Sequence, residues 1–325
     1  MGKQSIEKRK WIRNGMSFLI VSLILVKAFE YTHLYLARHS NQNQTGKINL
    51  IMAHKVDADL MIFGSSVSEV GITSNLLAEA LNVEVYNASI DGTSAVKSGY
   101  LVDEYIGYTN RCKVALFGLS AFALSSNDQV TQPSRFLAHY NRNEHVRNTM
   151  RTEAKELYAD MRIPFYSYAV ATSDYYKNVA FGLKNVMRGV ELAPDNENGS
   201  ILHDAEYVNT DDGRDARLEP QWNIAEKYQN LFKTVKAGNV LPVAVIMPLH
   251  RNGQKAYRDY SEYVNMVRRM CSESDVSVLD FSNHELCDQS EYFYNNGHLN
   301  IQGAEIITKI IADSLTFNQV LKVGQ

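Results

Sequence analysis

Two short motifs near opposite ends of the chain supply residue types that carry out nucleophilic chemistry together. Gly64-Ser65-Ser66 follows an apolar run, and Gly297-His298 precedes the last helix-like segment. A serine hydroxyl is a poor nucleophile until a base removes its proton, so the chemistry requires an imidazole within hydrogen-bond reach. Ser66 and His298 therefore predict a nucleophile and its base. The structural alternatives are a plain Gly-Ser turn and a capping or core histidine.

The hydrophobic pattern predicts the elements that position these residues. Short apolar runs alternate with helix-like segments, with one long interruption between the third and fourth runs. This βαβ rhythm predicts an α/β fold with a flavodoxin-like, parallel five-stranded sheet flanked by helices. We expect strands at 59–63, 83–87, 114–118, 241–248 and 276–280, and helices at 74–81, 95–108, 255–272 and 301–315.

Four candidate residues follow the ends of successive predicted strands. Ser66 comes after the first strand, Gly92 after the second, Ser120 after the third and His250 after the fourth. In an open parallel sheet, ligands bind beyond the carboxyl ends of the strands. We therefore expect these segments to meet at one edge of the sheet. For His250 we weigh a substrate contact against a solvated loop position.

The interruption at residues 129–238 is polar and aromatic and breaks the strand rhythm. We expect it to be an insertion of helices and loops in the sheet domain. Its aromatic side chains either stack on sugar rings or pack in a core, which is the commoner role. They include Tyr158, Tyr166, Tyr168, Tyr175, Tyr176, Trp222 and Tyr228.

Three segments together resemble the ordered blocks of the SGNH (GDSL-like) hydrolase superfamily. They are residues 62–68, which contain the first serine motif, residues 86–92, which end in Asp91-Gly92, and residues 298–304. The resemblance covers most of residues 59–315 outside the insertion. It implies that Ser66 is the nucleophile, that His298 is the base, and that backbone amides of Ser66 and Gly92 stabilise the oxyanion.

Two positions depart from that family pattern. The orienting acid, usually an Asp three residues before the histidine, is Asn295 here, and the usual Gly-x-Asn block reads Gly118-Leu119-Ser120. An amide oxygen can hold an imidazole in the right tautomer, but it cannot stabilise an imidazolium as a carboxylate does. Asn295 also fits an ordinary turn. We expect Ser120 to be a weak oxyanion donor, with Asn127 a little further on. Asp280 and Asp288 are the alternative acids.

The N-terminal segment predicts a membrane anchor. Five basic residues against one acid give the first 13 residues a charge of +4, ahead of an apolar stretch that begins at Met16. Basic residues before an apolar segment keep that end in the cytoplasm. A cleaved signal peptide and a buried helix are the alternatives, because the uninterrupted apolar core is shorter than the roughly 20 residues that span a bilayer. We expect a cytoplasmic tail at 1–13, a single-pass signal anchor at 14–36, a tether at 37–50 and an SGNH-like extracytoplasmic domain at 51–325.

Composition narrows the class of partner. The 325 residues are 45% hydrophobic and 21% charged, which is typical of a globular protein. The formal charge of the whole chain is -3, which leaves -7 for the part after residue 13. This charge does not favour nucleic-acid binding, because phosphates require a basic face. Three cysteines are too few for a disulfide scaffold, so we expect free thiols or one Cys271–Cys287 bridge. No spacing of Cys, His and acidic residues predicts a metal site, and we expect no cofactor.

The predicted anchor and the sequence blocks together are similar to bacterial cell-envelope proteins that act beside membrane-bound O-acyltransferases. The alginate acetylation proteins and the D-alanylation protein of lipoteichoic acid synthesis are examples. This similarity implies O-acetylation, or another acyl transfer, on a cell-surface polysaccharide by a domain outside the inner (cell) membrane. The alternatives are an extracytoplasmic carbohydrate esterase and a catalytically degenerate domain that binds glycan or scaffolds an acyltransferase.

Overall fold

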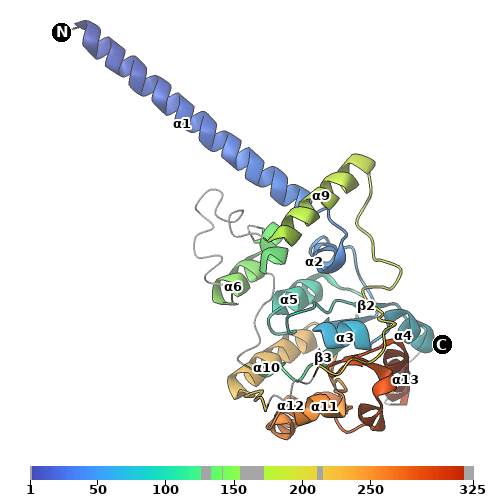
Figure 1. Ribbon diagram of the computed structural model, residues 1–325. Helices are drawn as coiled ribbons and strands as arrows, with labels where there is room; N and C mark the ends of the chain where they lie inside the picture. Colours follow the sequence, from blue (N-terminus) through green and yellow to red (C-terminus); the bar gives the residue numbers. More distant parts are fainter. Residues whose placement is uncertain (1, 126–132, 141, 154–171, 211–214, 318–325) are drawn as a thin grey trace. The chain divides into compact units, whose positions relative to one another are not determined.

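The computed structural model describes residues 2–125, 133–140, 142–153, 172–210 and 215–317 (Figure 1). The chain divides into two compact units. We call residues 1–42 with 133–191 the anchor unit, and residues 43–132 with 192–325 the sheet unit. The predicted membrane helix belongs to the anchor unit, and Ser66 and His298 both belong to the sheet unit.

The sheet unit is built on five parallel strands in the order β2-β1-β3-β4-β5. In this flavodoxin-like order the winding direction reverses between β1 and β3, which is where such folds bind ligands. The structure confirms the predicted fold class. The strands are β1 (Leu60–Gly64), β2 (Val85–Asn87), β3 (Val114–Leu119), β4 (Leu241–Ile246) and β5 (Ser277–Asp280).

Helices bury both faces of this sheet, as expected for parallel strands joined by helical crossovers. Successive strand residues point to opposite faces. On one face, Leu60 and Ile62 pack in a cluster with Ile307 of α13 (Ile301–Phe317). On the other, the ring of Phe117 lies 5.2 Å from that of Phe232 in α10 (Trp222–Ala237). The other helices of this unit are α2 (Asn43–Met52), α3 (Ser66–Gly71), α4 (Ser74–Leu81), α5 (Gly99–Tyr108), α11 (Arg251–Lys255), α12 (Tyr260–Glu273), η2 (Glu285–Asp288) and η3 (Ser290–Tyr292).

One helix of the sheet unit lies in the predicted tether, and another lies in the insertion that was expected to contain helices and loops. The end of the predicted tether forms α2, whose residues Ile48 and Ile51 are fully buried. The end of the predicted insertion forms α10, whose Tyr228 and Phe232 are fully buried in the core. In α2 the apolar residues Ile48 and Ile51 recur at helical spacing, which the polar residues around them obscured in the sequence.

The anchor unit contains α1 (Gly2–Ala37), η1 (Pro133–His139), α6 (Glu144–Glu153) and α9 (Ser173–Arg188). Within the described chain, α1 is long and apolar enough to cross a membrane by length and composition, with a mean hydropathy of 1.6 in its most apolar stretch. Tyr175 of α9 is buried, whereas Tyr176 is exposed. Tyr158, Tyr166 and Tyr168 lie outside the described residues.

The three cysteines are free and buried in the sheet unit. Burial raises the pKa of the Cys112 and Cys287 thiols to about 11 and that of Cys271 to about 12. Thiolates are the reactive form, so these residues behave as small apolar side chains at neutral pH.

Candidate active site

Strand β1 and helix α3 position the candidate nucleophile. Gly64 ends β1 opposite Gly118 of β3, and Ser66 is the first residue of α3. A β-carbon on either glycine would overlap Ser68 in the same helix. Both glycines are therefore required for α3 to pack this closely over the sheet, and this packing holds Ser66 at the carboxyl edge of β1.

A short hairpin positions the candidate base. Strands β6 (Phe293–Asn295) and β7 (His298–Leu299) are antiparallel, with Asn295 opposite His298. The Nε2 atom of His298 lies 2.8 Å from the Ser66 hydroxyl, across 232 positions in sequence. The structure thus brings the two predicted motifs into hydrogen-bond contact.

Asn295 completes the line of hydrogen bonds. Its Oδ1 atom lies 3.0 Å from Nδ1 of His298 and accepts a hydrogen bond from the Gly297 N–H at 2.8 Å. Because a backbone N–H must meet an oxygen, this second bond fixes the orientation of the amide. The oxygen in turn requires the imidazole proton on Nδ1, which leaves Nε2 free to accept the proton of Ser66. Asn295 therefore holds the tautomer that a serine mechanism needs.

The alternative acids are bound elsewhere. Asp280 pairs with Arg268 at 2.6 Å, and both oxygens of Asp288 accept hydrogen bonds from Arg251 at 2.8 and 2.9 Å. Neither carboxylate is available to orient His298 in this arrangement.

The imidazole of His298 sits under an aromatic side chain. The ring of Tyr294 stacks on it, with centroids 5.3 Å apart and planes at 16°, and His203 contacts the Tyr294 ring. Burial lowers the pKa of His298 below its ordinary value of 6.5, with the Asp91 charge opposing this effect and His203 adding to it. The base is therefore neutral at neutral pH, which is the form that accepts a proton.

The predicted oxyanion donors lie around the same edge. The Ile90 N–H donates to Gly64 O at 3.1 Å, so the loop after β2 runs beside the end of β1. Two residues later, Gly92 adopts a φ of 70°, in the left-handed region that favours glycine. Ser120 is the first residue after β3, and its side chain is half-buried. The oxyanion role of Ser66, Gly92 and Ser120 stays a prediction, and Asn127 lies outside the described residues.

His250 is buried at the end of β4. Its Nδ1 atom accepts the Asn252 N–H at 3.2 Å as the N-cap of α11 and lies 3.1 Å from the Tyr207 hydroxyl. That hydroxyl donates to Asn296 Oδ1 at 2.5 Å, and the His250 N–H donates to Asn296 O at 3.1 Å. Since Asn296 joins β6 to β7, His250 supports the hairpin that carries His298. This burial does not fit the solvated loop alternative, and the substrate contact of His250 stays a prediction.

The sequence did not identify a buried ion pair beneath the site. Lys47 of α2 contacts Glu69 of α3 at 2.5 Å, and both side chains are almost fully buried. Lys47 also donates to Ser89 O at 3.0 Å, and Gln44 donates to Glu69 at 2.6 Å. The pair therefore ties the helix of the nucleophile to the loop that leads to Gly92. The apolar residues around Lys47 were the sequence signal that it lies in a packed helix.

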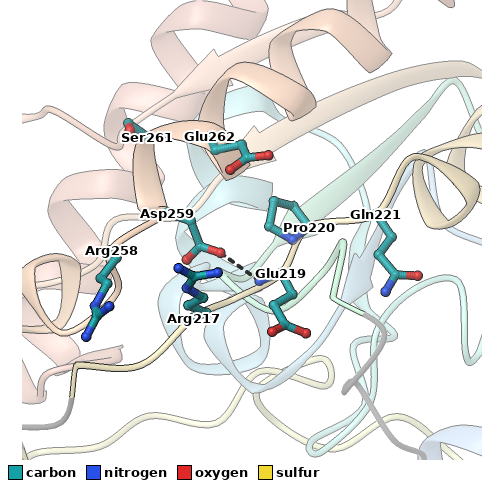
Figure 2. Close-up of a pocket in the computed structure, with 8 residues that line it drawn as sticks. All are labelled: Arg217, Glu219, Pro220, Gln221, Arg258, Asp259, Ser261 and Glu262. Carbon is teal, nitrogen blue, oxygen red and sulfur yellow. Dashed lines mark hydrogen bonds between the residues drawn. The ribbon is translucent and has the colours of Figure 1, made fainter.

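A polar pocket of about 620 Å³ opens elsewhere on the sheet unit (Figure 2). Asp259 in this pocket accepts the backbone N–H groups of Leu218 and Glu219, each at 2.8 Å, so the carboxylate fixes a loop. Within the described chain, no group of three or more His, Cys, Asp or Glu side chains is placed to hold a metal ion. The residues that line the pocket are Arg217, Glu219, Pro220, Gln221, Arg258, Asp259, Ser261 and Glu262.

Comparison with known proteins gives little beyond this geometry. No family model and no curated protein matches the chain. Among solved structures, the chain is similar to an acetyl xylan esterase at 13% identity and a TM-score of 0.38, with 81% of this chain and 100% of that chain covered. The contacts among Ser66, His298 and Asn295 are therefore the features that indicate a function.

Proposed function

We propose that this chain transfers an acyl group, acetyl by the family resemblance, on a cell-envelope polysaccharide through an ester of Ser66. The observation that supports it is the line of hydrogen bonds from Ser66 Oγ to His298 Nε2 and from His298 Nδ1 to Asn295 Oδ1. In this arrangement the base is neutral, correctly oriented and in contact with the nucleophile.

The proposed reaction has two steps. Ser66 Oγ attacks the acyl carbonyl while its proton passes to His298 Nε2, and the leaving group takes that proton as the serine ester forms. An acceptor hydroxyl then gives its proton to Nε2 and attacks the ester carbonyl. As the bond to Ser66 Oγ breaks, Nε2 returns this proton to Oγ, which restores the serine and the neutral imidazole. Backbone N–H groups of Ser66 and Gly92 are the proposed donors to the oxyanion of both steps. With water as the acceptor, the same site is an esterase.

The cellular setting is a further part of the proposal. Helix α1 has the length and composition of a membrane span, and the basic residues ahead of it favour a cytoplasmic N-terminus. We place the sheet unit outside the bacterial cell membrane, beside a membrane-bound O-acyltransferase that supplies the acyl group. This setting follows from the resemblance to cell-envelope acylation proteins.

Covalent labelling tests the central claim. The full-length protein in detergent is treated with a fluorophosphonate probe and digested, and the adduct is expected on the peptide that contains Ser66, only in the folded protein. Ser65 is the matched control, because its hydroxyl makes no hydrogen bond in the described structure, and Ser65→Ala should keep the labelling. An unlabelled Ser66 would favour the non-catalytic glycan-binding alternative.

The Asn295→Asp variant is expected to raise the turnover of an acetyl ester at neutral pH by about ten- to a hundredfold. The reverse exchange in a serine protease costs about 10⁴ because it also imposes the wrong tautomer. Here Asn295 already holds the right tautomer, so the carboxylate adds only stabilisation of the imidazolium. The measurement is kcat/KM for 4-nitrophenyl acetate.

The same variant predicts a shift in the pH profile. Since burial lowers the pKa of His298, wild-type kcat/KM should fall only as the pH drops below about 6.5. A carboxylate at position 295 favours the charged imidazolium and should move this acid limb to higher pH. His54→Gln is the control, because the His54 side chain is exposed and pairs with Glu104 rather than with the hairpin that carries His298. If the acid limb of kcat/KM does not move in Asn295→Asp, the group that titrates there is not His298.

A further inference from the structure

Helix α9 of the anchor unit carries an apolar stripe that is exposed in the described structure. Leu183 is nearly half exposed, and Met187 is 77% exposed. Together with Tyr176 and Ala180 they recur at spacings of four, three and four residues, which places them on one face of the helix. Contiguous exposed apolar surface of this kind marks an interaction site.

Basic residues follow one side of this stripe. Lys177, Lys184 and Arg188 are all exposed and lie at i, i+7 and i+11 along the same helix. An apolar face bordered by basic residues is typical of a helix that lies in the interface of a membrane, where the cations contact anionic headgroups.

The contacts of α9 with α1 show which way the stripe faces. Tyr176 contacts the ring of His33, in the earlier part of α1, with centroids 6.5 Å apart. On the opposite side of α9, Asn178 accepts a hydrogen bond from Ser40 at 2.5 Å and Asn185 donates to His39 O at 2.8 Å. The stripe therefore lies on the side of α9 that faces back along α1 toward its N-terminus.

The length of α1 indicates where α9 lies relative to the membrane surface. A span of about 20 residues covers the hydrocarbon core, so a span that begins after Arg13 ends near residue 34. Helix α9 meets α1 at this level, where a β-carbon on Gly182 would overlap the Leu36 carbonyl. Figure 1 shows α9 lying across this end of α1.

We propose that α9 is an interfacial helix whose apolar stripe inserts into the outer surface of the same membrane that α1 crosses. The occupant of the stripe is lipid, with anionic headgroups beside the three basic residues. This proposal goes beyond acyl transfer and rests on α1 being a membrane span. It fixes the anchor unit to the bilayer by two helices rather than one.

Site-directed spin labelling tests this proposal in the full-length protein, reconstituted in phosphatidylglycerol-containing nanodiscs. Nitroxides are placed by Met187→Cys on the stripe and by Lys184→Cys on the polar side as a matched control. The natural cysteines are buried and do not compete. At position 187, accessibility to oxygen should exceed accessibility to a water-soluble nickel chelate, and at position 184 this ratio should invert.

A third label at Leu23→Cys separates the outcomes. Oxygen-dominated accessibility at positions 23 and 187 supports the proposal. A lipid-exposed label at 23 with a nickel-accessible label at 187 overturns it and leaves the span intact. A label at 187 shielded from both reagents overturns it in favour of a protein cover, and spin–spin broadening would identify a second copy. A label at position 23 that is accessible to the nickel chelate would contradict both the membrane span and the interfacial helix. Fluorophosphonate labelling of Ser66 tests the catalytic proposal independently of these outcomes.

Discussion

Replacing Ser66 by alanine is expected to lower the turnover of a small acetyl ester by about 10⁴- to 10⁵-fold. Loss of the serine or the histidine of a complete triad costs about 2 × 10⁶ in kcat in a subtilisin-type protease. The wild-type rate starts lower here, because Asn295 supplies no negative charge to the imidazolium, so less catalysis remains to be lost. The measurement is kcat for 4-nitrophenyl acetate in the full-length protein.

Non-additivity provides the stronger test of the same prediction. In the proposed mechanism Ser66 and His298 act as a unit, so Ser66→Ala, His298→Ala and the double variant should all fall to nearly the same residual rate. His203→Ala is the matched control, because His203 lies near the site but contacts Tyr294 rather than Ser66. Its effect should stay below about tenfold. Multiplicative losses in the double variant would contradict a shared mechanism and place the ester hydrolysis elsewhere.

The sequence predicts the sheet because the sheet depends on local patterns. Strands buried on both faces are continuous apolar runs, and the βαβ rhythm leaves few topologies open. The two motifs at the site were also visible, because glycines mark the close packing of α3 over the sheet at Gly64 and Gly118. The strand order therefore predicts Ser66 at the carboxyl edge of the sheet, and the family resemblance implies that His298 lies beside it.

Features that depend on partners distant in sequence were less predictable. The choice between a turn residue and an orienting residue at Asn295 depends on where its oxygen points, and this is set by the Gly297 N–H and the imidazole together. The sequence left a substrate contact and a solvated loop position open for His250, because its contact with Tyr207, from the predicted insertion, forms only in the folded chain. The polar composition of the segment that forms α2 predicts a tether. Its polar residues find their partners only in the folded sheet unit, so their burial was not visible in the sequence.

The buried pair formed by Lys47 and Glu69 illustrates this most clearly, and it predicts the largest stability effect in the sheet unit. Lys47→Met is expected to lower the free energy of unfolding by about 3–5 kcal/mol, because it leaves the Glu69 charge buried without its partner. The double variant Lys47→Met with Glu69→Gln should recover most of this loss, since both charges are then absent. Trp222 fluorescence during urea unfolding reports on this unit when Trp11→Phe removes the other tryptophan.

A matched surface lysine distinguishes the ion pair from a general effect of charge removal. Lys113 is exposed in the same unit, and Lys113→Met should change the unfolding free energy by less than about 0.5 kcal/mol. Because Lys47 also donates to Ser89 O, the variant releases the loop that leads to Gly92, so esterase turnover should fall before global unfolding is reached. A cost below about 1 kcal/mol for Lys47→Met, or a double variant no better than the single one, would show that the charges do not depend on each other. A large loss in Lys47→Met that the double variant recovers would instead show that α2 stabilises α3, the helix that begins at Ser66, through the contact of Lys47 with Glu69.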